Sequence, residues 1–229
     1  MALKRQLIID DYKTAETGLW TLSSCKITKA TQVQNFVSVP GRFSPLDLST
    51  ASSDGVPYYD NASLDAVLES SEGTRAERAE RITKMINRFD GYSVQITHPD
   101  FPNHYLVGRI QVTQEYNDPV HCAVKVSAVC EPWLYNANET VVTVTLTTTE
   151  QTAALQNAGR LAVVPKVDVT GEATLIYGTI TQTLSTGTYY LPDLYLTPDG
   201  GPLQPAVHNV SCSGSGTVTF TYREAVLAE

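Results

Sequence analysis

Apolar and polar residues alternate along most of this chain, and this period of two restricts its fold more than any other feature. In the segment 122–130, every second residue from Cys122 to Cys130 is apolar. Because successive side chains of a strand point to opposite faces, this segment is predicted to be a strand with both cysteines turned inward. Similar β-branched and aromatic stretches between turn residues predict strands at 6–12, 20–27, 31–39, 92–97 and 105–116.

One stretch has a helical period instead. Between Thr74 and Asp90, apolar residues recur every three or four positions, at Ala79, Ile82, Met85, Ile86 and Phe89. Thr74 and Glu77 match a capping box, and Gly91 is typical of the residue after a helix. The pattern therefore predicts an amphipathic helix that lies on a sheet, with ion pairs Glu77–Arg81 and Glu80–Lys84.

The same helix carries four arginines, which are Arg75, Arg78, Arg81 and Arg88. They could be read as a phosphate-binding face. Glutamates lie between them, however, and a solvated face of mixed charge is the favoured interpretation.

The composition changes near residue 136. Up to Asn138 there are 13 basic and 16 acidic residues, and from Glu139 onward there are 3 and 8. The second part is rich in threonine and short β-like stretches, which is typical of a β-sandwich or jelly-roll-like module. We expect two domains, residues 1–136 and 137–229, in a mainly β protein: an N-terminal β-sandwich with one amphipathic helix, and a C-terminal β-sandwich.

The charge balance and the N-terminus limit the partners. The formal net charge is -8, and no basic cluster lies outside the helix, so binding to nucleic acid is disfavoured. The apolar run Leu7–Ile9 is too short for a signal peptide or a membrane span. We therefore expect a protein that is made in the cytoplasm and has no membrane partner.

No motif of catalysis, metal binding or cofactor binding is present in the sequence. The cysteines at 25, 122, 130 and 212 are scattered and are expected to be reduced core residues. The histidines at 98, 104, 121 and 208 lack metal-ligand spacing and are expected on the surface or in hairpins. The segment 211–216 lacks a nucleophile motif and is expected to be a flexible turn. An enzyme is thus disfavoured, and neither a metal nor a cofactor is expected.

Aromatic residues offer one alternative function. The rings of Trp133, Tyr189, Tyr190 and Tyr195 could stack on sugars, as in lectin-like β-sandwiches. Tyrosines of β proteins more often pack at a rim with a wet hydroxyl. A carbohydrate-binding module for recognition of a host surface is therefore the second hypothesis.

The long loop 44–61 and the residues before it carry a resemblance to a known family. The segment Val37-Ser38-Val39-Pro40-Gly41-Arg42, followed by Leu46-Asp47-Leu48, resembles a pattern of siphophage distal tail proteins. Phe43 and Ser44 depart from that pattern, which commonly has an acidic residue and a glycine there. Further resemblances, in the family's order, are the helix 78–89, Gly108-Arg109-Ile110 and Cys130-Glu131-Pro132-Trp133, and then the segments 157–160, 164–167 and 214–223 of the second part.

The resemblance implies a structural role in a virion. Proteins of this family form a ring, usually a hexamer of belt domains with galectin-like domains outside, between the tail tube protein and the tail-tip hub. The resemblance therefore implies a homo-hexamer at the tail tip, with DNA passing through its channel without specific binding. The inter-subunit contacts would come from an arm that includes Pro40, Gly41, Arg42, Leu46, Asp47 and Leu48.

Overall fold

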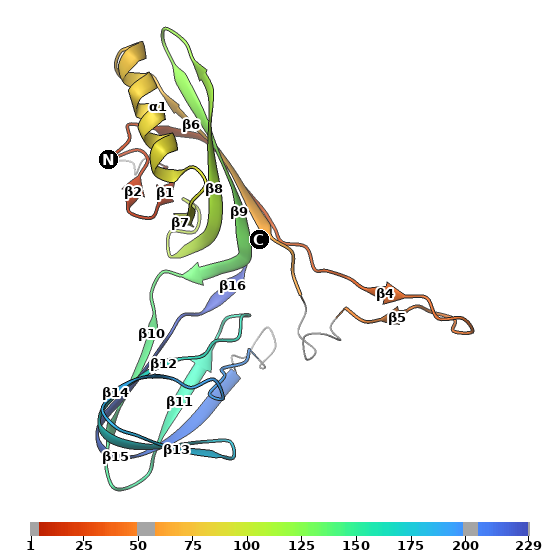
Figure 1. The fold of residues 1–229 in the computed structure, drawn as a ribbon, viewed down its shortest axis with the longest axis vertical. Helices are drawn as coiled ribbons and strands as arrows, with labels where there is room; N and C mark the ends of the chain where they lie inside the picture. Colours follow the sequence, from red (N-terminus) through yellow and green to blue (C-terminus); the bar gives the residue numbers. More distant parts are fainter. Residues whose placement is uncertain (1–4, 50–57, 199–205, 229) are drawn as a thin grey trace. The chain divides into compact units, whose positions relative to one another are not determined.

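The structure is a computed structural model that describes residues 5–49, 58–198 and 206–228 (Figure 1). It is mainly β with one helix, as the sequence predicts. The chain forms two compact units, Met1–Leu134 with Leu227–Glu229, and Tyr135–Val226. These compact units differ from the expected domains 1–136 and 137–229 in where residues 135–136 and 227–229 belong, and the domain division itself stays a prediction. Ala228 is fully buried, and its N–H donates to the carbonyl oxygen of Pro132 at 2.9 Å.

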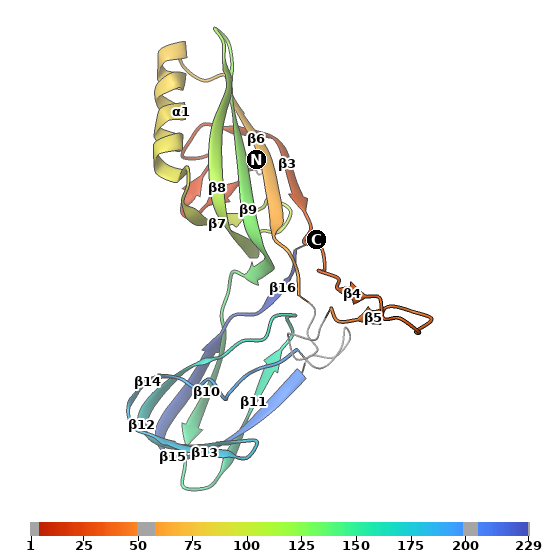
Figure 2. The ribbon, with the colours of Figure 1, turned by 45° about the vertical axis from the view of Figure 1, so that its right-hand side comes forward.

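The first unit is built on one curled sheet with the strand order β2-β1-β7-β8-β9-β6-β3, and β16 pairs with β9 off this path (Figure 2). A separate two-stranded ribbon consists of β4 and β5. The strands are β1 (Ile8–Ile9), β2 (Tyr12–Lys13), β3 (Thr21–Thr28), β4 (Phe36–Val37), β5 (Leu46–Asp47), β6 (Ala62–Ser70), β7 (Ser93–Thr97), β8 (His104–Asn117), β9 (Cys122–Asn136) and β16 (Ala225–Leu227), and of β16 only Leu227 belongs to this unit.

Two strand predictions for this unit need correction. The strand expected at 6–12 is divided into β1 and β2 by a turn at Asp10, which has a φ of 52°. The strand expected at 31–39 is reduced to β4 and an isolated bridge between Gln32 and Tyr59. By contrast, the inward face of β9 is confirmed, because Cys122, Cys130 and the three alternate residues between them are buried.

The helix α1 (Arg75–Phe89) has the predicted boundaries and caps. The Glu77 N–H donates to Thr74 Oγ1 at 3.3 Å, and the Thr74 N–H donates to Glu77 Oε2 at 2.7 Å. Ile82, Met85 and Phe89 are buried, and Ile86 is partly buried against the same core. The apolar face of the helix therefore covers the sheet, as Figures 1 and 2 show.

The charged side chains of α1 differ in part from the prediction. The Glu80–Lys84 ion pair forms at 2.7 Å. Glu77 instead uses its carboxylate for the cap, and Arg81 donates to Ser70 Oγ at 2.7 Å. Arg78 is not part of a solvated face, because only 2% of the residue is exposed and its guanidinium binds backbone carbonyls.

The second unit is organised by two long strands, β12 (Lys166–Tyr177) and β15 (Ala206–Tyr222), which pair with each other. Their outer neighbours change halfway along. Near one end these are β14 (Gly187–Tyr190) and β10 (Thr140–Leu146), and near the other end they are β13 (Ile180–Leu184) and β11 (Gln151–Asn157). A second apolar core fills this unit, with Leu155, Val167, Leu175, Val210, Cys212, Val218 and Phe220 among its members.

Glycines mark the place where the neighbours change. Gly171 is paired with Gly216, and both have a φ of +96°. A side chain at Gly216 would collide with the carbonyl group of Thr170. The segment 211–216 is therefore not a flexible turn but the middle of β15, where glycine permits close approach of two backbones and a conformation that other residues rarely adopt.

Candidate interaction surface

A segment of the first unit contains no buried side chain among its described residues. We call residues 31–49 and 58–60 the arm; all of them are exposed or only partly buried. Figures 1 and 2 both show β4 and β5 outside the sheet. The rest of the predicted loop, residues 50–57, lies outside the described residues.

Main-chain hydrogen bonds hold the arm in a hairpin. Phe36 pairs with Asp47, and Val37 pairs with Leu46. The N–H of Leu48 extends the ribbon by donating to the carbonyl oxygen of Asn35 at 2.8 Å. This ribbon brings both halves of the predicted motif together in space.

The turn of this hairpin contains Pro40, Gly41 and Arg42. Gly41 has a φ of +85°, which glycine adopts without strain. The Arg42 N–H donates to the carbonyl oxygen of Val39 at 3.2 Å. Next to the ribbon, hydrogen bonds from the Ser49 hydroxyl and N–H hold the pKa of Asp47 below its usual value. The backbone therefore defines the hairpin, although no side chain of the arm is buried.

The exposed apolar side chains of the arm are typical of an interaction surface. Phe43 is fully exposed, and Phe36, Val37 and Val39 are more than a third exposed. A lone two-stranded hairpin is marginally stable in water, and clustered exposed apolar residues often mark an interaction site. The arm has the properties of a segment that is stabilised by contact with another molecule. The role of its six motif residues in such a contact stays a prediction.

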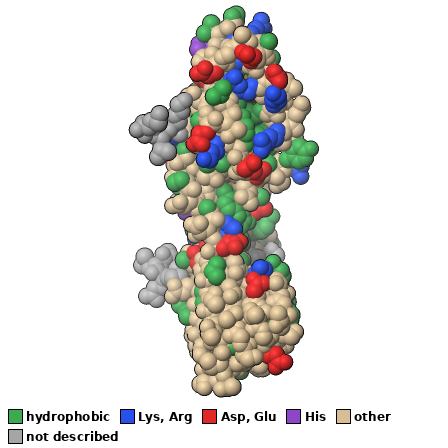
Figure 3. All heavy atoms as spheres, turned by 90° about the vertical axis from the view of Figure 1, so that its left-hand side faces the viewer, with side chains coloured by type: hydrophobic (Ala, Val, Ile, Leu, Met, Phe, Trp, Pro, Cys, Tyr) green, Lys and Arg blue, Asp and Glu red, His purple; other side chains and the backbone are tan. Residues whose placement is uncertain are grey.

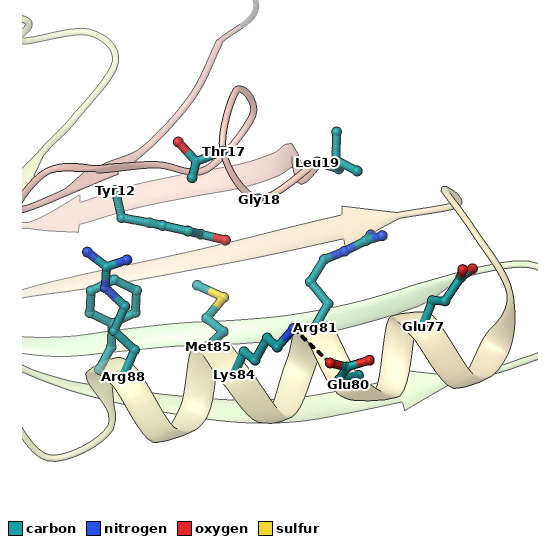
Figure 4. Close-up of a pocket in the computed structure, with 11 residues that line it drawn as sticks. Tyr12, Thr17, Gly18, Leu19, Glu77, Glu80, Arg81, Lys84, Met85 and Arg88 are labelled. Carbon is teal, nitrogen blue, oxygen red and sulfur yellow. Dashed lines mark ion pairs between the residues drawn. The ribbon is translucent and has the colours of Figure 1, made fainter.

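A second surface feature of this unit is a groove of about 350 Å³ along α1 (Figure 4). Its walls come from Tyr12, from the loop 17–19, and from one face of the helix. Leu19 stands at this loop with a φ of 56° and a half-exposed side chain. A left-handed backbone is unfavourable for leucine, and exposure of its apolar side chain to water is unfavourable as well. We infer that surrounding contacts hold the loop in this conformation.

The cations that line this groove are already engaged. Arg88 pairs with Asp11 at 2.6 Å and lies 5.3 Å from the centroid of the Tyr12 ring. Lys84 pairs with Glu80, as Figure 4 also shows. On the face of the first unit that carries α1, positive and negative side chains are interspersed (Figure 3). The arrangement does not offer the concentrated positive charge that a phosphate backbone needs.

The histidines and acids do not form a metal site within the described parts of the chain, where no group of three potential ligands is found. His98 lies in the hairpin loop between β7 and β8, as one of the two expectations has it, but it is not on the surface, because only 5% of it is exposed. Its Nδ1 accepts a hydrogen bond from the Asp100 N–H at 3.1 Å, and burial lowers its pKa. Its Nε2 is buried and has no hydrogen-bond partner within the described residues, so His98 is a buried and only partly satisfied residue of the loop that follows β7.

The four aromatic residues proposed as a sugar platform have different environments. Trp133 packs edge to face on Tyr59, with ring centroids 5.8 Å apart. The Tyr189 hydroxyl donates to the carbonyl oxygen of Ser185 at 3.0 Å, and its ring packs on the core. Tyr190 and Tyr195 are both exposed, and Tyr195 borders a cavity of about 460 Å³. Trp133 and Tyr189 are thus engaged in packing within their own units, whereas Tyr190 and Tyr195 present exposed rings, and a role of these rings in sugar binding stays a hypothesis.

Comparison with known proteins gives a likeness in fold. No protein-family model matches the chain, and no curated protein matches it in sequence. The crystal structure of the SPP1 Dit (gp 19.1) protein, described as a paradigm of the hub adsorption apparatus in phages that infect Gram-positive bacteria, is similar with a TM-score of 0.64. The similarity covers 95% of this chain and 98% of that one at 13% sequence identity. The chain therefore has the fold of a phage Dit protein.

Among the residues that the structure describes, no helix is long and apolar enough to cross a membrane.

Proposed function

We propose that this chain is a structural protein of the tail tip of a long-tailed phage or prophage, where it joins the tail tube to the host-adsorption apparatus, and that it is not an enzyme. The observation that carries the proposal is the likeness to SPP1 Dit, because it covers nearly the whole of both chains. A likeness of this extent includes both units of the molecule, so it does not rest on one common β module. The motif at 37–48 supports the same assignment independently.

In this proposal the chain forms a ring, a homo-hexamer, in the virion. The first domain is the belt and the second is a galectin-like sandwich on the outside. The arm contacts a neighbouring copy through the hairpin of Pro40, Gly41, Arg42, Leu46, Asp47 and Leu48, and this contact covers its exposed apolar side chains. A ring needs one repeated heterologous contact, which a projecting apolar arm can supply. The tail tube protein and the tail-tip hub protein are the other partners.

The oligomeric state tests the ring. Negative-stain images and mass measurement of the purified protein should show closed rings. Phe43→Ser should shift the protein toward monomers while circular dichroism stays unchanged, since Phe43 makes no contribution to the core of its own chain. Val120→Ser is the matched control, because Val120 is also a largely exposed apolar residue of the first unit and lies outside the arm.

Two results would contradict this part of the proposal. One is a wild-type protein that stays monomeric at high concentration. The other is a ring that survives the double substitution Phe36→Ser and Phe43→Ser. A monomeric wild type would contradict the ring itself, whereas a ring that survives both substitutions would contradict only the arm contact.

The negative charge of the chain leads to a separate expectation about DNA in the channel of the ring. Six copies with a net charge of -8 each would repel the phosphate backbone, so DNA would pass without binding. A gel-shift assay with duplex DNA at low salt should show no retention. Retention that disappears as salt is added would indicate a basic lumen and would contradict the proposed passage.

A further inference from the structure

The groove along α1 has an apolar and aromatic part. Its volume is about 350 Å³, at the lower end of the range for binding pockets, which suits one large side chain. Tyr12, Met85 and Phe89 are among the residues that line it. The ring centroids of Tyr12 and Phe89 lie 5.3 Å apart. A further aromatic side chain that enters the groove can therefore pack on a ring and on the thioether of Met85.

Leu19 lies at the edge of this groove in a conformation that is unfavourable without a partner. Its φ is 56°, and 52% of the residue is exposed. The loop around it is fixed, because the Thr17 N–H donates to the carbonyl oxygen of Lys13 and the Trp20 N–H donates to that of Thr14, both at 2.9 Å. The leucine side chain is thus presented in one place. Contact with an apolar partner would offset the cost of its exposure, with little loss of conformational entropy.

The arm carries an apolar side chain that suits this groove. Phe43 lies beside the turn of the hairpin and is fully exposed. Aromatic side chains that fill a pocket are typical anchors of protein interfaces. Figures 1 and 2 show the ribbon of β4 and β5 projecting from the side of the first unit that lies away from α1. A projection and a groove on opposite sides of one unit can meet between two copies of the chain.

Charged side chains beside the phenylalanine and the groove are complementary. Arg42 precedes Phe43, is exposed, and has no ion pair within the described residues. The carboxylates of Glu77 and Glu80 border the groove. The side chain of Glu80 is 66% exposed although it pairs with Lys84, so its carboxylate is accessible to a second cation. Insertion of Phe43 would bring Arg42 close to this carboxylate.

A second groove of the first unit fits the arm less well. It crosses β6, β8 and β9 and has a volume of about 460 Å³. Among the described residues that line it, none is aromatic and none is a methionine, whereas Asp65, Arg109 and Gln111 are exposed. It offers no ring for Phe43, and burial of its charged groups would be costly. The groove along α1 is therefore the better receptor for the arm.

We propose that the groove along α1 of one copy receives the Phe43 side chain from the arm of a second copy of this chain. Phe43 packs on Tyr12 and Leu19 of the second copy, and Arg42 pairs with its Glu80. This inference rests on the proposed function in taking the partner to be another copy, and it adds the surface on which the arm docks. The contact is heterologous, so the arm and the groove of each copy serve two different neighbours, as a ring requires.

Cross-linking with a bismaleimide tests the docking site directly. Ser44→Cys places a thiol next to Phe43, and Thr17→Cys places one on the loop of Leu19; both positions are exposed. Co-expressed single variants should give linked dimers in a denaturing gel, and a chain with both substitutions should give a ladder of multimers. Ser44→Cys with Val120→Cys is the matched control and should give no dimer, because Val120 is exposed but lies in the turn between β8 and β9.

Two further variants separate docking from folding. Leu19→Gly should not lower the free energy of unfolding in urea, because glycine adopts a positive φ without strain and the lost side chain is exposed. The concentration at which its rings dissociate should nevertheless rise about tenfold. Arg42→Glu should weaken the rings several-fold, and the added substitution Glu80→Arg should restore them, because it reverses the charges of the pair.

The outcomes distinguish the docking site from the ring. Rings that form equally well in the wild type and in Leu19→Gly, without a link between positions 17 and 44, would overturn the docking site and leave the ring. A link to position 120 in place of position 17 would overturn it as well. Linked dimers without closed rings would support the docking site and contradict the ring. A monomeric wild type without cross-links would contradict both.

Discussion

Arg78 provides a sharp test of how the first unit is held together. Its guanidinium donates to the carbonyl oxygen of Gly73 at 2.6 Å and to those of Asp118 and Pro119 at 2.9 Å each. One of these acceptors lies just before the helix, and the other two lie in the turn between β8 and β9. A single buried side chain therefore fastens the helix to a hairpin that is 40 residues away in sequence.

The magnitude follows from these three bonds. A hydrogen bond to a charged group contributes about 1.5–3 kcal/mol, and these acceptors are partly accessible to water, which favours the lower value. Burial of the cation opposes this, and Nε has no partner within the described residues. The net loss on Arg78→Met should thus be about 3 kcal/mol. Arg78→Lys keeps the charge but cannot bridge three carbonyl groups, so it should lose about 2 kcal/mol.

Urea titration followed by tryptophan fluorescence measures this loss of stability in the first unit. The chain has two tryptophans, Trp20 and Trp133, and both belong to the first unit. Arg75→Met is the matched control, because Arg75 is an exposed arginine of the same helix turn and should change stability by less than about 0.5 kcal/mol. An Arg78→Met variant as stable as this control would refute the reasoning.

Four further outcomes are expected. Phe89→Ala should destabilise the first unit by about 3–5 kcal/mol in the same titration, since the ring is buried. Gly216→Val should prevent folding of the second unit, seen as a lost transition in circular dichroism, because its Cβ has no space. Burial raises the pKa of Cys130 and Cys212 to about 11, so both thiols should react with Ellman's reagent only after unfolding. The lowered pKa of His98 means that its neutral form is favoured in the fold. Its contribution to stability should be complete above its ordinary value of 6.5 and be lost as the pH falls below it, and His98→Gln should remove this dependence.

The features that the sequence predicted correctly depend on neighbours in sequence. The limits of α1 follow from a capping box and a glycine within the helix's own ends. The inward face of β9 follows from simple alternation between Cys122 and Cys130. In both cases each residue's environment is decided within one turn or one strand, so a single sequence contains the necessary information.

The features that the sequence missed depend on distant partners. Arg78 looks like any surface arginine between glutamates, and only the turn at Asp118 and Pro119 makes it a buried one. Gly214 and Gly216 have the composition of a turn, yet they pair with β12 in the middle of a long strand. The cavity beside Tyr195 was missed for the same reason, since its residues come from three separate segments.

The arm is the most informative difference between sequence and structure. Phe36, Val37 and Val39 have the composition of a half-buried strand, and a strand at 31–39 was expected from them. Within this chain they are exposed, and the strand is reduced to two residues. The composition of a segment indicates that it can be buried. It does not indicate whether the surface that covers it belongs to the same molecule or to another one. A strand-like sequence without a core of its own is what an inter-subunit contact requires, and for this reason Phe43→Ser should disturb assembly and leave the fold intact.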